Sequence, residues 1–283
     1  MNGIFPRIIE PSPSPLRESW LGREDEIIMF MEQFRLDGKV ALVTGGSRGV
    51  GRAVALAFAE AGADVAIAAR KMPDLESTAA EIEKLGRKAL PISAHIGRKE
   101  GRERVIETVG REFGHIDVLV NNAATNTHYG PAMAIGEDAW DKIIEANLKG
   151  QLFLTQAVVK LMRQHGKGGT IVNVASDGGF RPYPNIGIYG VTKAGLIMLT
   201  QVLAQELGKD NIRVNAVAPG WLQTGFSRIV WENPKTLGDI LSHTATGRLG
   251  QAEDVAGAVL LLASDASSHI SGQTIVIEGG YFI

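Results

Sequence analysis

Short apolar runs alternate with amphipathic stretches along most of the chain, beginning near Lys39. The run from Val40 to Val43 is continuously apolar, which is typical of a strand buried on both faces. Stretches with helical spacing separate it from further runs of the same kind. The expected strands cover residues 40–43, 64–69, 89–93, 118–120, 170–174, 211–218 and 274–277, and the expected helices cover 52–61, 73–85, 99–113, 137–162, 189–207 and 252–262.

This alternation predicts a doubly wound α/β fold. Strands separated by helices form right-handed βαβ crossovers, which build a parallel sheet with helices on both faces. We therefore expect one Rossmann-type domain over residues 36–283, a length that a single hydrophobic core supports.

The first 35 residues have a different composition. Pro11, Pro13 and Pro15 alternate with serines, which favours an extended segment, and residues 23–34 have the spacing of a short amphipathic helix. We expect residues 1–35 to form a flexible leader; an arm that docks on a neighbouring subunit is the alternative. The segment lacks the basic start and apolar stretch of a secretory signal, and its acidic residues argue against a transit peptide.

Charge and composition exclude several classes of protein. The chain has 283 residues, 29 of them basic and 31 acidic, so its net charge of −2 argues against a nucleic-acid-binding face. It has no cysteine, which excludes disulfides, thiolate catalysis and cysteine-based metal sites. The six histidines form no H-x-x-x-H pair, so we expect no metal. No apolar run approaches the roughly 20 residues of a membrane span, so we expect no membrane partner. The lack of cysteine fits a reducing compartment, and Tyr281 to Ile283 lack the Ser-Lys-Leu type of peroxisomal address, so we expect a cytoplasmic protein.

A glycine-rich turn, Thr44 to Gly51, joins the first expected strand to the first helix. Gly45, Gly49 and Gly51 permit a tight turn and let a pyrophosphate approach the backbone, while the N–H groups of the helix face that anion. Because the turn lies between a strand and a helix, it predicts dinucleotide binding.

The end of the second strand indicates which dinucleotide binds. NAD-binding proteins usually carry an acidic residue there, about 20 residues beyond the glycines. This chain has Arg70 and Lys71 instead, and together with Arg48 these cations could bind a 2′-phosphate. The alternative is that all three are solvated surface cations. The pattern favours NADP(H) over NAD(H).

Tyr189 and Lys193 have the spacing that places two side chains on one face of a helix. A free phenol has a pKa near 10, and a neighbouring ammonium stabilises the phenolate. We therefore expect Lys193 to lower the pKa of Tyr189 and make it a general acid/base. A tyrosine and a lysine at this spacing are common on surface helices, so a catalytic role for the pair needs support from other residues.

Further polar residues lie where strands end. Ser176 follows the strand 170–174, and Asn121 to Ala124 follow the strand 118–120. Pro219 and Gly220 end the strand 211–218, with Leu222 and Thr224 just beyond. Asn147 lies inside a long expected helix, where an asparagine is not favoured. Ligands of open α/β sheets bind at the carboxyl ends of the strands, so these residues are candidates for a site.

Taken in order, these elements resemble the single-domain branch of the short-chain dehydrogenases/reductases, from about residue 36 to 280. The resemblance implies that Tyr189 exchanges a proton with a carbonyl oxygen, that Ser176 hydrogen-bonds this oxygen, and that Lys193 binds the ribose. It also implies that Asn147 bends its helix around a water linking Lys193 to solvent. The cofactor-binding residues expected are Gly45, Ser47, Arg48, Gly49, Val50, Gly51, Arg70, Lys71, His95, Ile96, Asn121, Ala123, Tyr189, Lys193, Pro219, Gly220, Leu222 and Thr224.

The chain departs from the family pattern at two positions. Ala124 replaces the final glycine of the N-N-A-G motif, a small change in backbone packing. His95 occupies the position where the family often has an aspartate that touches adenine, which puts that contact in doubt.

The substrate is expected among three loops, 125–131, 178–188 and 221–247. The last is a lid with apolar side chains that either close over an apolar carbonyl compound or pack against the helices beneath.

The narrower likeness is to NADPH-dependent carbonyl reductases of the retinal type. The alternatives on the same frame are a 3-oxoacyl-thioester reductase and a polyol, sugar or steroid dehydrogenase. A non-catalytic NADP-binding regulator is a further alternative, but it should lack part of the catalytic tetrad, which is Asn147, Ser176, Tyr189 and Lys193. A two-domain epimerase needs a further C-terminal domain. The resemblance also implies pairing of the apolar helices 136–163 and 189–207 into a homodimer or homotetramer.

Overall fold

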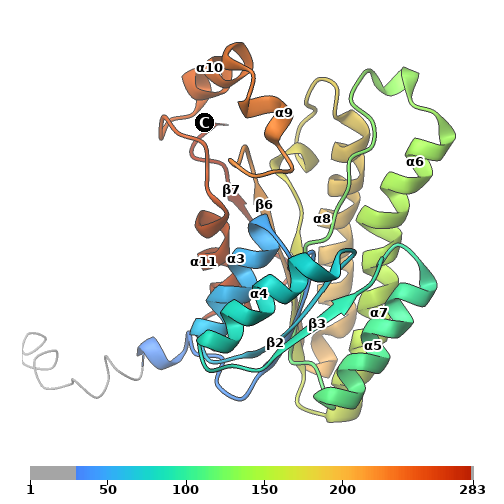
Figure 1. The fold of residues 1–283 in the computed structure, drawn as a ribbon, viewed down its shortest axis with the longest axis vertical. Helices are drawn as coiled ribbons and strands as arrows, with labels where there is room; N and C mark the ends of the chain where they lie inside the picture. Colours follow the sequence, from blue (N-terminus) through green and yellow to red (C-terminus); the bar gives the residue numbers. More distant parts are fainter. Residues whose placement is uncertain (1–29, 282–283) are drawn as a thin grey trace, which may run out of the picture.

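Seven parallel strands form the centre of the structure, a computed structural model that describes residues 30–281. Their order across the sheet is β3-β2-β1-β4-β5-β6-β7, and helices cover both faces (Figure 1). The predicted doubly wound α/β fold is confirmed. The strands are β1 (Val40–Thr44), β2 (Asp64–Ala69), β3 (Ala89–Ser93), β4 (Val118–Asn121), β5 (Gly169–Val174), β6 (Ile212–Pro219) and β7 (Thr274–Ile277).

The direction of winding reverses at β1. Val43 pairs with Ile67 of β2 on one side and with Val120 of β4 on the other. The turn after β1 and the loop after β4 therefore meet at the carboxyl edge of the sheet, where open α/β sheets bind their ligands. This reversal places the glycine turn beside the residues that follow Asn121.

Two hydrophobic cores hold the helices against the sheet. On one face lie α3 (Gly49–Glu60), α4 (Met72–Lys84) and α11 (Ala252–Ala263), whose core includes the fully buried Phe58. On the other face lie α5 (Lys99–Glu112), α7 (Gly150–His165) and α8 (Gly187–Leu207). Each fully buried large apolar side chain contributes about 1.5–3 kcal/mol to the free energy of unfolding.

The long helix expected over residues 137–162 is three pieces. α6 (Glu137–Ile144) passes into a π-helical turn, Glu145–Lys149, and α7 then continues to His165. The side chain of Asn147 explains the interruption, because its amide bonds to the backbone of Thr125 on the neighbouring loop. A π-turn inside an α-helix is often found at functional sites.

Other boundaries differ by a few residues for local reasons. α3 begins at Gly49 rather than at residue 52, so the glycine turn supplies its first turn. α8 begins at Gly187, two residues before Tyr189. β6 begins at Ile212, because Asn211 has a left-handed backbone (φ 56°) that extended strands do not contain.

The expected lid contains two helices, α9 (Arg228–Trp231) and α10 (Pro234–His243). Its apolar residues divide into two groups. Val230 and Ile240 are buried in a small core shared with Leu249, whereas Phe226 is 54% exposed. One part of the lid therefore packs on itself, and another part presents apolar surface outward.

Most of the expected leader lies outside the described residues, as does the first part of the helix expected over 23–34. Within the described part, residues 30–32 are helical and Leu36 is buried against the core of α3. Whether residues 1–35 are a flexible leader stays a prediction.

One helix among residues 30–281 is long and apolar enough to cross a membrane, which the sequence analysis did not expect. It is α8 with the 3₁₀ turn that follows it (Gly187–Asp210, mean hydropathy 1.3). The helix lies against β6 and contains Tyr189 and Lys193, but only 28% of its apolar window is buried. Length and composition alone are weak evidence for a membrane span.

Candidate active site

Thr44 and Asn122 shape the edge where β1 and β4 end. The buried Thr44 hydroxyl donates to the carbonyl oxygen of Val120 and accepts from the N–H groups of Asn122 (3.0 Å) and Ala123 (3.1 Å). The Asn122 amide in turn donates to the carbonyl oxygen of Thr44 (2.8 Å). Asn122, which the sequence analysis did not single out, therefore holds the start of the glycine turn.

The glycine turn requires residues without side chains at two of its positions. Gly45 has φ +68°, which disfavours any other residue, and a Cβ on Gly51 would lie 2.2 Å from the Gly45 carbonyl oxygen. Ser47 and Val50 are partly exposed on the same turn. Thr224 lies opposite, since a Cβ built on Gly49 would be 3.8 Å from its Cβ. The start of the lid therefore faces the glycine turn.

Ser176, Tyr189 and Lys193 meet where β5 ends and α8 begins. The Lys193 ammonium is 1% exposed and donates to the carbonyl oxygen of Val174, the last residue of β5, at 2.6 Å. Its nitrogen lies 5.4 Å from the centroid of the Tyr189 ring. This hydrogen bond ties the first turns of α8 to the strand end that leads to Ser176.

Asn147 joins the π-turn to this group. Its amide accepts from the Thr125 N–H (2.8 Å) and donates to the Thr125 carbonyl oxygen (2.9 Å) and to the Thr192 hydroxyl (3.2 Å). Thr192 donates to the carbonyl oxygen of Tyr189 at 2.7 Å. The four tetrad residues thus come together from three segments of the chain, and the role of water at Asn147 stays a prediction.

The electrostatics differ from the expectation that Lys193 lowers the pKa of Tyr189. Burial raises the pKa of Tyr189 above its ordinary value, the charge of Asp177 raises it further, and the Ser176 hydroxyl lowers it. Burial also lowers the pKa of Lys193 to about 7. The expected direction of the Tyr189 pKa shift was wrong for the protein without a cofactor. The spacing of Tyr189 and Lys193 along the helix does not show that both side chains are buried away from water.

A buried carboxyl group beside Ser176 was also missed. Asp177 is 3% exposed; it accepts from the Ser176 hydroxyl at 3.1 Å and from the Tyr183 hydroxyl at 2.6 Å. The Tyr183 ring packs edge-on against Trp221 of the lid at 5.2 Å. Burial is the main cause that raises the pKa of Asp177, and the charge of Glu278 adds to it. The sequence signal was present, since Asp177 directly follows Ser176.

The three cations expected to bind a 2′-phosphate lie at the carboxyl ends of the neighbouring strands β1 and β2. Arg48 directly precedes α3, and Arg70 and Lys71 follow β2, the neighbour of β1. All three are exposed, and none forms an ion pair with any residue in the described range 30–281. Their positive charge is therefore free to attract an anion near the glycine turn.

The remaining predicted residues fall into two groups. Asn121 is 1% exposed, and its amide donates to Thr155 and Asn173, so its side chain braces β4 against α7 and β5 instead of lining the edge. The others follow strand ends at the carboxyl edge. They are His95 and Ile96 after β3, Ala123 after β4, and Pro219, Gly220 and Leu222 at the end of β6.

The buried Lys193 ammonium should cost stability. A pKa of about 7 against an ordinary 10.5 corresponds to ~5 kcal/mol against the charged form in the folded chain. Because the unfolded chain holds this proton up to higher pH, the free energy of unfolding should rise with pH between about 7 and 10.

We therefore expect Lys193→Met to raise the free energy of unfolding by about 2 kcal/mol at pH 6, after the loss of the Val174 hydrogen bond is deducted. The gain should shrink as the pH rises toward 9. Denaturant titrations at several pH values measure it, with Lys160→Met, an exposed lysine on α7, as the control. A destabilised Lys193→Met protein at pH 6 would contradict this account.

The chain is similar to known proteins along most of its length. A family model described as Enoyl-(Acyl carrier protein) reductase matches residues 45–282. The chain is similar to "Dehydrogenase/reductase SDR family member 4" of Bos taurus, with 40% identity over 245 residues that cover 87% of this chain and 88% of that protein.

Two solved structures are similar along nearly their full length. A putative short-chain alcohol dehydrogenase from Sinorhizobium meliloti is 38% identical, with a TM-score of 0.84 over 88% of this chain and 98% of that one. A putative NAD(P)-dependent gluconate 5-dehydrogenase from Beutenbergia cavernae, solved with bound NADP, is 32% identical, with a TM-score of 0.83 over 88% and 98%. The chain belongs to the short-chain dehydrogenase/reductase family and is an oxidoreductase that acts on alcohol and carbonyl groups.

Proposed function

We propose that this protein is an NADP(H)-dependent carbonyl reductase that interconverts a ketone or aldehyde with its alcohol. The observation that carries the proposal is the convergence of Ser176, Tyr189 and Lys193 at the sheet edge that holds the glycine turn, with Asn147 bonded behind them. A non-catalytic regulator does not require these four residues to lie together, which argues against that alternative.

The residues at the edge fit a dinucleotide. The missing side chains of Gly45 and Gly51 let the turn pack closely on Asn122 and on its own backbone, directly before α3 begins at Gly49. The N–H groups in the first turn of such a helix favour an anion such as a pyrophosphate. Arg48 forms no side-chain cap on these N–H groups. The expected cofactor residues of the turn would hold the phosphates, and Thr224 would close over them from the lid.

Each member of the tetrad has a distinct task in this proposal. A bound nicotinamide supplies or accepts the hydride. Tyr189 gives its proton to the carbonyl oxygen during reduction and takes one from the alcohol during oxidation. Ser176 donates a hydrogen bond to the same oxygen and holds it in place as negative charge develops. Lys193 favours the phenolate and binds the ribose, and Asn147 positions the start of α8 through Thr192.

The proposed preference for NADP(H) rests on charge. Arg48, Arg70 and Lys71 bring three exposed cations to the ends of β1 and β2, with no acidic residue at the end of β2. A 2′-phosphate forms charge-assisted hydrogen bonds with such groups. NAD(H) lacks this phosphate and would gain nothing from them.

The substrate class is supported by the surface around Tyr189. The Phe226 ring of the lid lies 5.7 Å from the Tyr189 ring, and Trp221 packs on the far side against Tyr183. These aromatic groups favour an apolar carbonyl compound. A 3-oxoacyl-thioester reductase and a polyol or steroid dehydrogenase remain the alternatives. An NADPH-oxidation screen with ketones, diketones, retinal, 3-oxoacyl thioesters and keto-sugars separates them.

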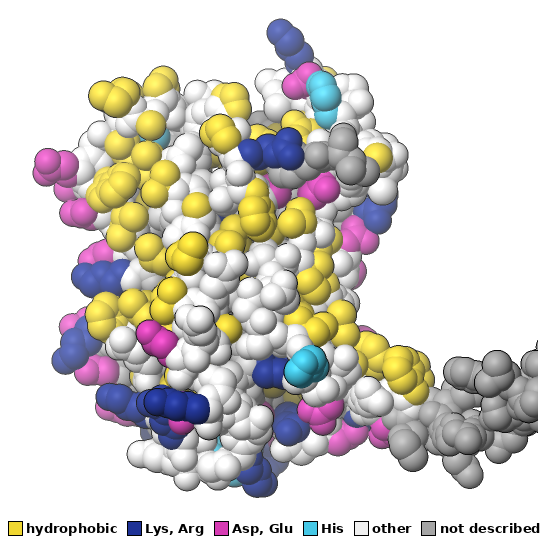
Figure 2. Space-filling view, turned by 180° about the vertical axis from the view of Figure 1, so that it is seen from behind, with side chains coloured by type: hydrophobic (Ala, Val, Ile, Leu, Met, Phe, Trp, Pro, Cys, Tyr) yellow, Lys and Arg dark blue, Asp and Glu magenta, His cyan; other side chains and the backbone are white. Residues whose placement is uncertain are grey.

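We also propose a cytosolic homodimer or homotetramer. Figure 2 shows apolar side chains gathered on the side of the molecule that carries α6, α7 and α8. Trp140, Phe153, Met198 and Val202 on these helices are 39–60% exposed. Size-exclusion chromatography with light scattering measures the oligomeric state, and a monomer would contradict this part of the proposal.

Replacing the proton donor should stop the reaction but not cofactor binding. We expect Tyr189→Phe to lower kcat by at least about 10³-fold, because only the phenol hydroxyl is lost. The Kd for NADPH, measured by fluorescence titration, should stay within about threefold. Ser77→Ala, which removes an exposed hydroxyl on α4 outside the three expected substrate loops, is the control and should keep full activity. Near-normal turnover by Tyr189→Phe would overturn the mechanism.

Reversing one charge at the end of β2 should change the cofactor preference. We expect Arg70→Asp to reduce the ratio of kcat/KM for NADPH over NADH by about tenfold or more, because it repels a 2′-phosphate and can accept from a 2′-hydroxyl. Lys84→Asp, at the other end of α4, has the same charge change and should leave the ratio unaltered. An unchanged ratio in Arg70→Asp would reject the phosphate-binding role.

Asp177 should make the reduction pH-dependent. The Ser176 hydroxyl has one proton, and when Asp177 is ionised that proton points to Asp177 instead of the substrate oxygen. A protonated Asp177 can donate to Ser176, which then donates to the substrate. Since burial raises the pKa of Asp177, reduction should fall as the pH rises through that pKa.

We expect Asp177→Asn to flatten this decline, because its amide can donate to Ser176 and accept from Tyr183 at any pH. Tyr183→Phe should move the decline to higher pH, since the Tyr183 hydrogen bond lowers the pKa of Asp177. Profiles of kcat against pH test both variants. Profiles that coincide with that of the natural protein would show that Asp177 has no part in orienting Ser176.

A further inference from the structure

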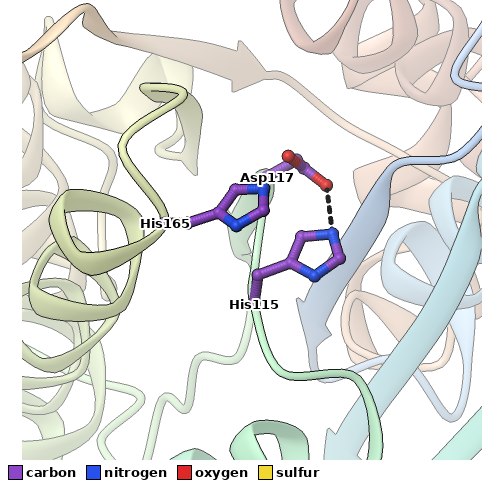
Figure 3. Close-up of side chains that lie close together, drawn as sticks. All are labelled: His115, Asp117 and His165. Atoms are coloured by element: carbon purple, nitrogen blue, oxygen red, sulfur yellow. Dashed lines mark ion pairs between the residues drawn. The ribbon is translucent and has the colours of Figure 1, made fainter.

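Two histidines and an aspartate meet at the end of the sheet opposite the tetrad. His115 and Asp117 come just before β4, and His165 is the last residue of α7. Their side chains point toward one another (Figure 3). The residues lie at the amino edge of the strands, whereas Ser176 and the glycine turn lie at the carboxyl edge. The reaction proposed above therefore makes no use of them.

The donor atoms of this group are close together. The His115 Nε2 atom lies 3.2 Å from Asp117 Oδ2, and the rings of His115 and His165 stack at 4.3 Å. One nitrogen from each histidine and one carboxylate oxygen all lie within 4.8 Å of one another. Asp117 is only 7% exposed and its Oδ2 also accepts from the Val40 N–H, so the carboxylate is fixed to the start of β1.

Each ring nitrogen of His115 faces an oxygen that can accept a hydrogen bond. Its Nδ1 lies 3.0 Å from the Phe113 carbonyl oxygen, which only accepts, and its Nε2 faces the Asp117 carboxylate. A neutral imidazole can donate to only one of them, whereas an imidazolium donates to both. A metal ion at Nε2 is the other arrangement that satisfies both atoms: histidine ligands of metals usually donate their other N–H to a carbonyl or carboxylate oxygen.

The ligand set indicates which metal. Two imidazole nitrogens and one carboxylate oxygen suit Zn²⁺, which takes four ligands in a tetrahedron at about 2.0–2.2 Å. Ligands at that distance lie about 3.4 Å apart, so His115 and Asp117, at 3.2 Å, already have a suitable separation. The His165 ring is stacked on the His115 ring at an interplanar angle of 14°, so binding of the same ion requires the His165 side chain to rotate.

We propose that His115, Asp117 and His165 form a binding site for one Zn²⁺ ion, with the fourth position open to water. The ion connects the end of α7 to the amino ends of β1 and β4. It stabilises the fold and takes no part in hydride transfer, because the tetrad lies at the other end of the sheet. The sequence analysis expected no metal because it looked for histidines close together in sequence, and residue 165 is far from residues 115 and 117.

Calorimetric titration of the full, tag-free chain with ZnCl₂ at pH 7.5 tests the site. We expect one Zn²⁺ per chain, and at least a tenfold loss of affinity in His165→Ala and in His115→Gln. His269→Ala, an exposed histidine elsewhere, is the matched control and should bind as the natural protein does. Absence of binding, or equal affinity in His165→Ala, would overturn the proposal.

Measuring the Tm with and without Zn²⁺ distinguishes a variant that has lost the site from one that folds poorly. Zn²⁺ should raise the Tm of the natural chain and of His269→Ala, and should leave the Tm of His165→Ala unchanged. Carbonyl reduction by His165→Ala should equal that of the natural chain, so this test is independent of the proposed function. An equal rise in Tm for His165→Ala would contradict the site.

Discussion

The hydrogen bond from the buried Lys193 ammonium to the Val174 carbonyl oxygen is the interaction on which the site depends. It joins the first turns of α8 to the end of β5 and so brings Tyr189 beside Ser176. A carbonyl oxygen is a weak partner for a buried charge, and burial lowers the pKa of Lys193 to about 7 while it raises that of Tyr189. The stability lost by burying Lys193 is typical of functional sites, and it keeps the ammonium beside the Tyr189 ring.

The rest of the active-site region holds this pair in place. Asn147 interrupts its own helix to bond Thr125 and Thr192, and Thr192 bonds the Tyr189 backbone. On the other side, Asp177 accepts from the hydroxyls of Ser176 and Tyr183, and the Tyr183 ring packs on Trp221 of the lid. Phe226 of the lid contacts the Tyr189 ring, while a small core of the lid keeps α9 and α10 together.

The fold could be predicted from the sequence because buried parallel strands are nearly pure apolar runs, and the helices between them have a clear period. The π-turn could not, because it depends on a bond from Asn147 to a loop that is distant in sequence. The linear motifs located Ser176, Tyr189 and Lys193 and included Asn122 among the residues that follow β4. They did not show that Asn122 holds the glycine turn or that Asp177 bonds to Tyr183, because these contacts depend on how loops fold back on strand ends. The direction of the Tyr189 pKa shift was wrong because spacing along a helix gives proximity and says nothing of burial.

The proposed reaction depends most directly on Lys193 favouring the phenolate form of Tyr189 when the cofactor is bound. NMR of protein with ¹³C-labelled tyrosine, titrated with pH with and without NADP⁺, measures this directly, and Tyr189→Phe assigns the signal. The account predicts that Tyr189 ionises above the pKa of free tyrosine in the protein alone, and below it, under about 10, once NADP⁺ is bound. A Tyr189 signal that titrates at the same pH in both conditions would contradict it.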